Sequence, residues 1–246
     1  MLAPAPITAV LKEAIGRGHR DNVVVRSSGG PAGNTRLIAW TGLSLLVLIL
    51  AQLVTLLDVS GLISWHVVIG MLLVGLTLLK TASVVWRMAR YYAGCSAYRA
   101  AGAPPTLLRW LGPFVAVTAL GLLGSGLALI ALGPRSSRRP LVSVLGLELD
   151  AVTLHQVLFF AFAAAVGLHV IARLIPAVTT LAGRAQRTQA VPGGLRRIAV
   201  VLVVLGVGAL VGSFVLGPAR SWRRDYQHYR QVSVRPVNST PLRLRR

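Results

Sequence analysis

Five stretches of this chain contain no charged residue, and each is long enough to cross a lipid bilayer as a helix. They are Leu37–Leu57, Val59–Leu79, Trp110–Gly133, Ala151–Ala172 and Ile198–Ala219. A helix needs about 20 apolar residues to span the hydrocarbon core of a membrane. Backbone groups in lipid must form hydrogen bonds within their own segment, and the alternation of a barrel strand is absent, so helices are predicted. We therefore expect an all-α integral membrane bundle of five transmembrane helices.

The charge composition excludes an ordinary soluble protein. The chain has 26 Lys and Arg but only 6 Asp and Glu, and charged residues make up 13% of it, with a mean hydropathy of +0.69. Soluble domains contain about 25% charged residues. Because the apolar residues lie in membrane-length runs, the net charge of +20 is not interpreted as a nucleic-acid surface. The single cysteine, Cys95, excludes a disulfide framework.

The distribution of arginine predicts the orientation in the membrane. The loops after the second and fourth predicted helices contain nine arginines: Arg87, Arg90, Arg99, Arg109, Arg173, Arg184, Arg187, Arg196 and Arg197. The loop after the first helix contains none, and the loop after the third contains Arg135, Arg138 and Arg139. Short loops rich in Lys and Arg stay in the cytoplasm. We expect a multi-pass protein of the cell (inner or plasma) membrane, with its N-terminus inside and its C-terminus outside.

These assignments divide the chain into four parts. Residues 1–35 form a cytoplasmic N-terminal segment, and residues 36–176 form a four-helix core. Residues 177–219 comprise a cytoplasmic loop and a fifth transmembrane helix, and residues 220–246 form a basic extracytoplasmic tail.

Three of the five histidines, His66, His155 and His169, lie inside predicted spans. Ionisable groups in a span are costly and usually functional, although a single histidine is explained equally well by a helix–helix hydrogen bond. His155 and His169 are 14 residues apart, so they share a helix face about 21 Å apart. His66 lies on a parallel helix at the depth of His155. Two imidazoles in this arrangement would clamp a flat macrocycle from both sides, as axial ligation of haem iron requires.

Lys80 lies 14 residues beyond His66, so it shares the predicted depth of His169. The sequence therefore offers an outer pair, His66 with His155, and an inner pair, Lys80 with His169. A lysine must lose its proton to bind iron, and its stem also suits snorkelling to the interface. Arg87, Arg90 and Arg173 are candidate partners of haem propionates, and topology or anionic lipid explains them as well.

With these residues in place, the chain resembles the bacterial membrane cytochromes b of the b561, Ni-hydrogenase and formate-dehydrogenase kind. The resemblance extends from about Arg36 to Arg173. The matching residues are Arg36, Trp40, His66, His155 and His169. Ala39 stands where these proteins have a histidine that binds the inner haem. The resemblance implies a four-helix haem-binding core plus one extra helix, with one or two b haems, Lys80 being a candidate replacement for the missing ligand.

The resemblance also implies a function. The expected protein is a non-catalytic subunit of an oxidoreductase complex that carries electrons across the bilayer, between an extracytoplasmic or peripheral redox subunit and quinone or another acceptor. The tail residues Trp222, Tyr226 and Tyr229, among arginines, are a candidate docking site for that subunit, because aromatics and arginine favour interfaces. The alternatives are a haem-free transporter or assembly subunit and a stand-alone ferric or superoxide reductase.

Overall fold

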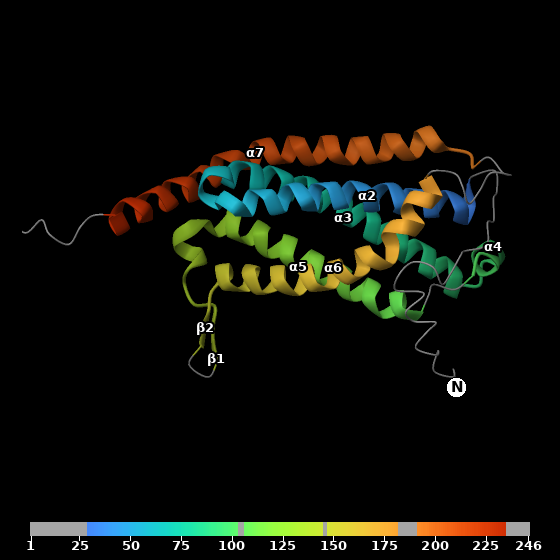
Figure 1. Ribbon diagram of the computed structural model, residues 1–246, viewed down its shortest axis with the longest axis horizontal. Helices are drawn as coiled ribbons and strands as arrows, with labels where there is room; N and C mark the ends of the chain where they lie inside the picture. The colour runs from blue at the N-terminus through green and yellow to red at the C-terminus, as the bar shows by residue number, and fades with distance from the viewer. Residues whose placement is uncertain (1–28, 103–105, 145–146, 182–190, 235–246) are drawn as a thin grey trace, which may run out of the picture.

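The computed structural model describes residues 29–102, 106–144, 147–181 and 191–234, and nearly all of this part is helical. Its long helices lie side by side along one axis (Figure 1). They are α2 (Gly30–Thr55), α3 (Val59–Tyr92), α5 (Thr106–Ser137), α6 (Ala151–Leu181) and α7 (Gly194–Val234). The shorter elements are η1 (Leu56–Asp58), α4 (Ser96–Ala100), β1 (Val142–Val144) and β2 (Leu147–Leu149). The predicted all-α bundle of five helices is confirmed.

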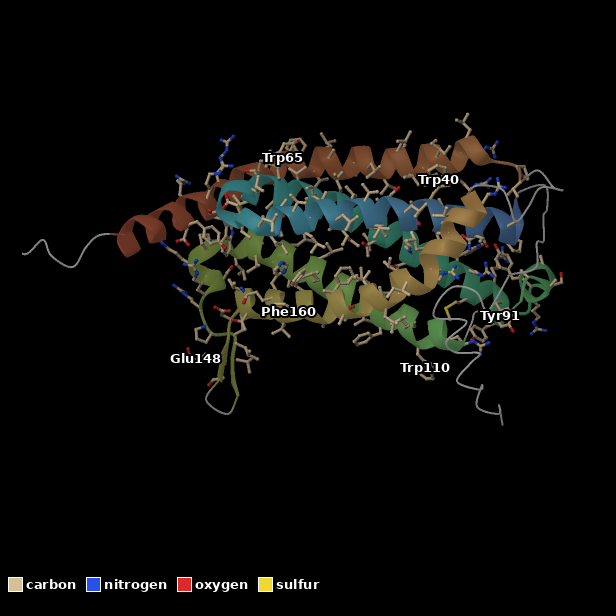
Figure 2. All side chains as sticks on the ribbon, in the orientation of Figure 1. Trp40, Trp65, Tyr91, Trp110, Glu148 and Phe160 are labelled. Atoms are coloured by element: carbon tan, nitrogen blue, oxygen red, sulfur yellow. The ribbon has the colours of Figure 1, made fainter. Side chains whose placement is uncertain are left out.

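Four segments of the described chain are long and apolar enough to cross a membrane. They are Gly30–Tyr92, Arg109–Ser137, Ala151–Ile171 and Gly194–Tyr226. The first segment has 63 residues and contains two helices, α2 and α3, which fold back on each other at η1. Large apolar side chains cover the outside of the bundle, as the labelled Trp65 and Phe160 show (Figure 2), with exposed fractions of 63% and 70%. Such a surface suits contact with lipid.

The turn between α2 and α3 lies where the sequence predicts it. The carboxylate of Asp58 accepts hydrogen bonds from the backbone N–H of Gly61 at 3.0 Å and from the hydroxyl of Ser60 at 2.7 Å. Asp58 thereby caps α3, whose first N–H groups have no partner inside the helix. A side chain at Gly61 would collide with this carboxylate, which explains the glycine.

The connection from α5 to α6 is also determined by residues that lie close to it in the sequence. Gly133 has φ of 72°, a left-handed conformation that interrupts α5 before Pro134, as predicted. The antiparallel strands β1 and β2 follow, and the carboxylate of Asp150 then accepts a hydrogen bond of 2.7 Å from the backbone N–H of Thr153. This bond caps the N-terminus of α6.

The helix neighbours define a four-helix core with one helix outside it. The helix α2 packs against α3 and α6, and α5 packs against the same two helices. The parallel helices α3 and α6 therefore occupy opposite corners of the core (Figure 1). The fifth helix, α7, packs mainly along α3. The η1 turn and the β1–β2 hairpin mark one end of the bundle, here called the hairpin end, and α4 marks the other, the α4 end.

Glycines allow α7 to approach α3 closely. A Cβ atom built on Gly208 would lie 3.1 Å from the Cα atom of Leu72, and one on Gly75 would lie 2.9 Å from Cγ1 of Val204. Small residues are the usual means of close helix packing in membranes. Gly208 and Gly212 form a G-x-x-x-G motif on the contact face.

The sequence predicts a tail from residue 220 onward, but residues 220–234 belong to the helix α7. The helix α7 continues without a break to Val234, and the side chain of Trp222 is only 6% exposed. Its indole N–H donates a hydrogen bond of 3.3 Å to the carbonyl oxygen of Leu129 in α5. Trp222 therefore packs inside the bundle and is not on an open docking surface, a correction to the prediction. Residues 1–28 and 235–246 lie outside the described residues, whereas residues 30–35 of the expected N-terminal segment belong to α2.

Candidate functional site between two histidines

His66 and His155 approach each other from opposite corners of the core, near the hairpin end. His66 lies in the third turn of α3, and His155 lies in the second turn of α6. Their side chains are close enough for the charge of one to act on the other. The structure therefore brings the outer pair together at one depth, on parallel helices, as the spacing along the chain predicts.

The ring of His66 is held by two side chains from the end of α2. The hydroxyl oxygen of Thr55 lies 2.8 Å from Nδ1 of His66, and the amide nitrogen of Gln52 lies 3.0 Å from the same atom. The Thr55 hydroxyl donates its hydrogen to the carbonyl oxygen of Gln52 at 2.6 Å. Its oxygen can accept the hydrogen of Nδ1, whereas the amide N–H of Gln52 can only donate to that atom, so the two contacts require opposite tautomers of His66.

The ring of His155 is held in the same manner from α5. The hydroxyl oxygen of Ser125 lies 2.9 Å from Nδ1 of His155, and this hydroxyl donates to the carbonyl oxygen of Leu122 at 2.9 Å. The Ser125 oxygen is again left to accept the hydrogen of Nδ1. At His155 this arrangement places the proton on Nδ1.

This tautomer of His155 leaves a lone pair on its Nε2 atom. Within the described residues, no hydrogen bond reaches either Nε2 atom. Histidines that ligate metals almost always donate their other ring N–H to a neighbouring group, which fixes the tautomer and orients the ring. The two rings have the chemistry of paired nitrogen ligands.

Glycines leave room around both rings. A Cβ atom built on Gly70, one turn after His66 on the same face of α3, would meet no atom within 4 Å. On α5, a Cβ built on Gly126 would lie 3.3 Å from Cε1 of His155, so any larger residue there would press on the ring.

The inner pair also comes together, nearer the α4 end. Lys80, His169 and Arg173 lie within electrostatic range of one another. The surroundings differ from those of the outer pair, because the Nδ1 atom of His169 is buried with no hydrogen-bond partner in the described part of the chain. Ala39, which replaces the expected family histidine, is buried in α2.

The remaining arginine candidates have other contacts. Arg87 donates a hydrogen bond of 2.7 Å to the hydroxyl of Thr35 and so links α3 to the start of α2. The guanidinium of Arg90 is exposed, stacks 4.5 Å above the ring of Trp86 and contacts the sulfur of Cys95 at 3.5 Å. Of the three arginines, the structure places Arg173 beside the inner pair.

The sequence prediction did not include the residues that hold the two rings. Thr55 and Ser125 were not singled out, and Gln52 was not linked to His66. Gln52 lies 14 residues before His66. In a helical hairpin with its turn midway between two residues, those residues reach the same depth, and this signal would have found Gln52. No comparable pattern links Ser125 to His155, which is 30 residues away.

The described histidines do not belong to a cluster of side chains that would hold a bare metal ion. Among the described residues, no group of three or more His, Cys, Asp or Glu side chains is placed to hold a bare metal ion. A porphyrin supplies four nitrogens of its own, so two histidines complete the coordination of its iron.

The chain matches no model of a known protein family, no curated protein and no solved structure.

Proposed function

We propose that this protein is a membrane cytochrome b that carries single electrons across the bilayer through a b haem between His66 and His155. The observation that supports this function best is the matched setting of the two rings. Each Nδ1 atom faces a hydroxyl whose own hydrogen is used by a helix carbonyl. Each ring is thereby oriented by a helix other than its own, and its Nε2 atom, which has no hydrogen bond within the described residues, would hold the iron of a bound haem.

The residues present fit the group. Two neutral imidazoles on opposite corners of the core supply two axial nitrogens, and Gly70 and Gly126 keep bulk away from the rings. When bound, a haem supplies one reversible one-electron couple, Fe(III)/Fe(II). The chain orients both imidazoles and surrounds them with apolar helices, which exclude water from the site.

The partners follow from the chain's own chemistry. The single cysteine of the chain cannot hold an iron–sulfur cluster, so electrons must reach the proposed haem from other molecules and leave it to other molecules. We propose a peripheral or extracytoplasmic redox subunit on one side and quinone or another acceptor on the other. We propose that the arginine-rich α4 end lies on the cytoplasmic side of a cell membrane.

The test is a reduced-minus-oxidised spectrum of the purified protein. We expect a b-type α band in the wild type and its loss in both His66→Ala and His155→Ala. The matched controls His19→Ala and His228→Ala remove histidines outside the predicted spans and should keep the band. A wild type without a haem spectrum would support the haem-free transporter or assembly role instead.

The number of haems per chain tests the inner pair. Ligation of a second haem by Lys80 and His169 stays a prediction from the sequence. Two haems per chain, with loss of one in Lys80→Ala, would support it, and one haem per chain would restrict ligation to the outer pair. Reduction of ferric chelates or superoxide by the isolated protein would favour the reductase alternative.

A further inference from the structure

The strands β1 and β2 form a hairpin with one apolar face and one polar face. The pairs across its ladder are Val142 with Leu149, Ser143 with Glu148, and Val144 with Leu147. Successive residues of a strand lie on opposite faces of the sheet. The first and last pairs therefore share one face, which consists of valine and leucine, and the middle pair has the other. This alternation is typical of a sheet with one face in water and the other covered.

No helix of the described chain covers the apolar face. Val142 is 53% exposed and Leu149 is 41% exposed. The two strands pair with each other, and within the described residues no helix packs along them. A single two-stranded hairpin is at best marginally stable in water. The apolar face of this hairpin therefore needs a surface outside the described bundle.

The hairpin lies at one boundary of the membrane. The apolar span in α5 ends at Ser137, and the next span begins at Ala151, so β1 and β2 connect two spans on the same side of the bilayer. The hairpin projects sideways from the bundle, across the common direction of the long helices (Figure 1). Because those helices cross the bilayer, the hairpin extends along the membrane surface.

The polar face of the hairpin is turned away from the membrane. The labelled Glu148 lies on the side of the hairpin that is directed away from the middle of the bundle (Figure 2). Val142 and Leu149 are on the opposite face, which is therefore turned toward the level of the hydrocarbon core. Amphipathic segments at a membrane surface have this arrangement, with charge toward water and apolar side chains toward the acyl chains.

We propose that the β1–β2 hairpin is an interfacial anchor, whose apolar face rests on the lipid bilayer at the hairpin end. The direction of the strands along the membrane surface and the outward position of Glu148 favour lipid over a protein partner as the cover of this face. The free edges of the strands stay at the level of the headgroups, where water can satisfy their backbone groups. The anchor fixes the depth at which α6 enters the membrane. It requires a membrane-spanning bundle but no haem, so this inference and the proposed electron transfer can fail separately.

The experiment measures the surroundings of single positions in the full chain, embedded in phosphatidylcholine nanodiscs. In a Cys95→Ser background, a nitrobenzoxadiazole fluorophore is attached to Val142→Cys or Leu149→Cys on the apolar face. The matched controls are Ser143→Cys and Glu148→Cys, their neighbours on the polar face. All four side chains are exposed, so the substitutions should leave the gel-filtration profile unchanged.

Two quenchers distinguish the possible surroundings of the fluorophore. We expect a lipid with a nitroxide near the top of its acyl chain to quench positions 142 and 149 more strongly than positions 143 and 148. Iodide dissolved in the water should give the reverse order. Equal iodide quenching at all four positions would overturn the proposal, because the hairpin would then stand in water. Protection of positions 142 and 149 from both quenchers would also overturn it, because a second copy or another protein would then cover the face.

Discussion

The hydroxyl oxygen of Thr55 lies 2.8 Å from Nδ1 of His66, at the point where α2 ends and α3 returns alongside it. Ser125 of α5 has the equivalent position at His155. Helices that do not contain the histidines therefore control the orientation of both rings. This relationship leads to the first prediction.

Thr55→Val removes the hydroxyl that contacts Nδ1 of His66 and can accept its hydrogen, and it keeps the size of the side chain. We expect the variant to bind haem about 10–100-fold more weakly, the usual effect of losing such a partner. The midpoint potential should rise, because a ring that no longer shares its Nδ1 proton donates less electron density to Fe(III). Redox titration of the α band measures the shift.

The control for this prediction is Ser213→Ala, which removes an exposed hydroxyl that bonds only to the Leu210 carbonyl in α7. Haem affinity and potential should stay at the wild-type values. Wild-type values in both Thr55→Val and Ser125→Ala would contradict the assigned role of the hydroxyls.

Gly208→Ala should separate α7 from α3. The added Cβ would lie 3.1 Å from the Cα of Leu72, a backbone atom that cannot move aside alone. We expect a loss of about 1–3 kcal/mol in the free energy of unfolding, typical of overpacking. Unfolding in sodium dodecyl sulfate, followed by circular dichroism, gives the measurement.

Gly206→Ala is the matched control, because a Cβ on Gly206 meets nothing within 4 Å. This change should be neutral or stabilising by up to about 1 kcal/mol, since alanine favours helix over glycine. An equal effect of both substitutions would mean that close approach does not decide the packing of α7.

Asp150→Ala should destabilise α6 by about 1 kcal/mol through loss of its cap. Hydrogen bonds from the backbone N–H and the side chain of Thr153 lower the pKa of Asp150 below its usual value of 3.8. A lowered pKa means that the stabilisation is complete above pH 4 and is lost as pH falls through the folded-state pKa. The difference between wild type and variant in unfolding titrations should therefore disappear in strong acid, whereas a constant difference would exclude ionic capping.

Cys95 reports the orientation of the protein, because it is the single cysteine and precedes α4. If the α4 end faces the cytoplasm, a membrane-impermeant maleimide should label Cys95 only after the cells are opened. The second variant is Arg224→Cys in a Cys95→Ser background. It places an exposed thiol in the C-terminal part of α7, at the hairpin end, and this thiol should react in intact cells. The reverse pattern would show the opposite orientation.

Much of this structure could be predicted from the sequence because the reasons are local. Uncharged runs of about 20 residues must become helices in lipid, so the spans and the turn at Asp58 were predictable. Helical rise and periodicity placed His66 level with His155, and Lys80 level with His169. Local chemistry also predicted the helix break at Gly133.

Other features depend on which helices become neighbours, and hydropathy does not encode that choice. The diagonal placement of α3 and α6, the hydroxyl of Ser125 at His155 and the close approach of Lys80 to Gly42 all arise from contacts between segments distant in the chain. The burial of Trp222 against Leu129 is the clearest case. An aromatic residue in an arginine-rich tail is predicted to be exposed, and only the packing of α7 against α5 buries it. The sequence by itself determined the spans and the depth of each ionisable group, because rise per residue and transfer to lipid act along one helix. Only the tertiary structure decided which groups meet, because side-chain packing between helices selects their neighbours.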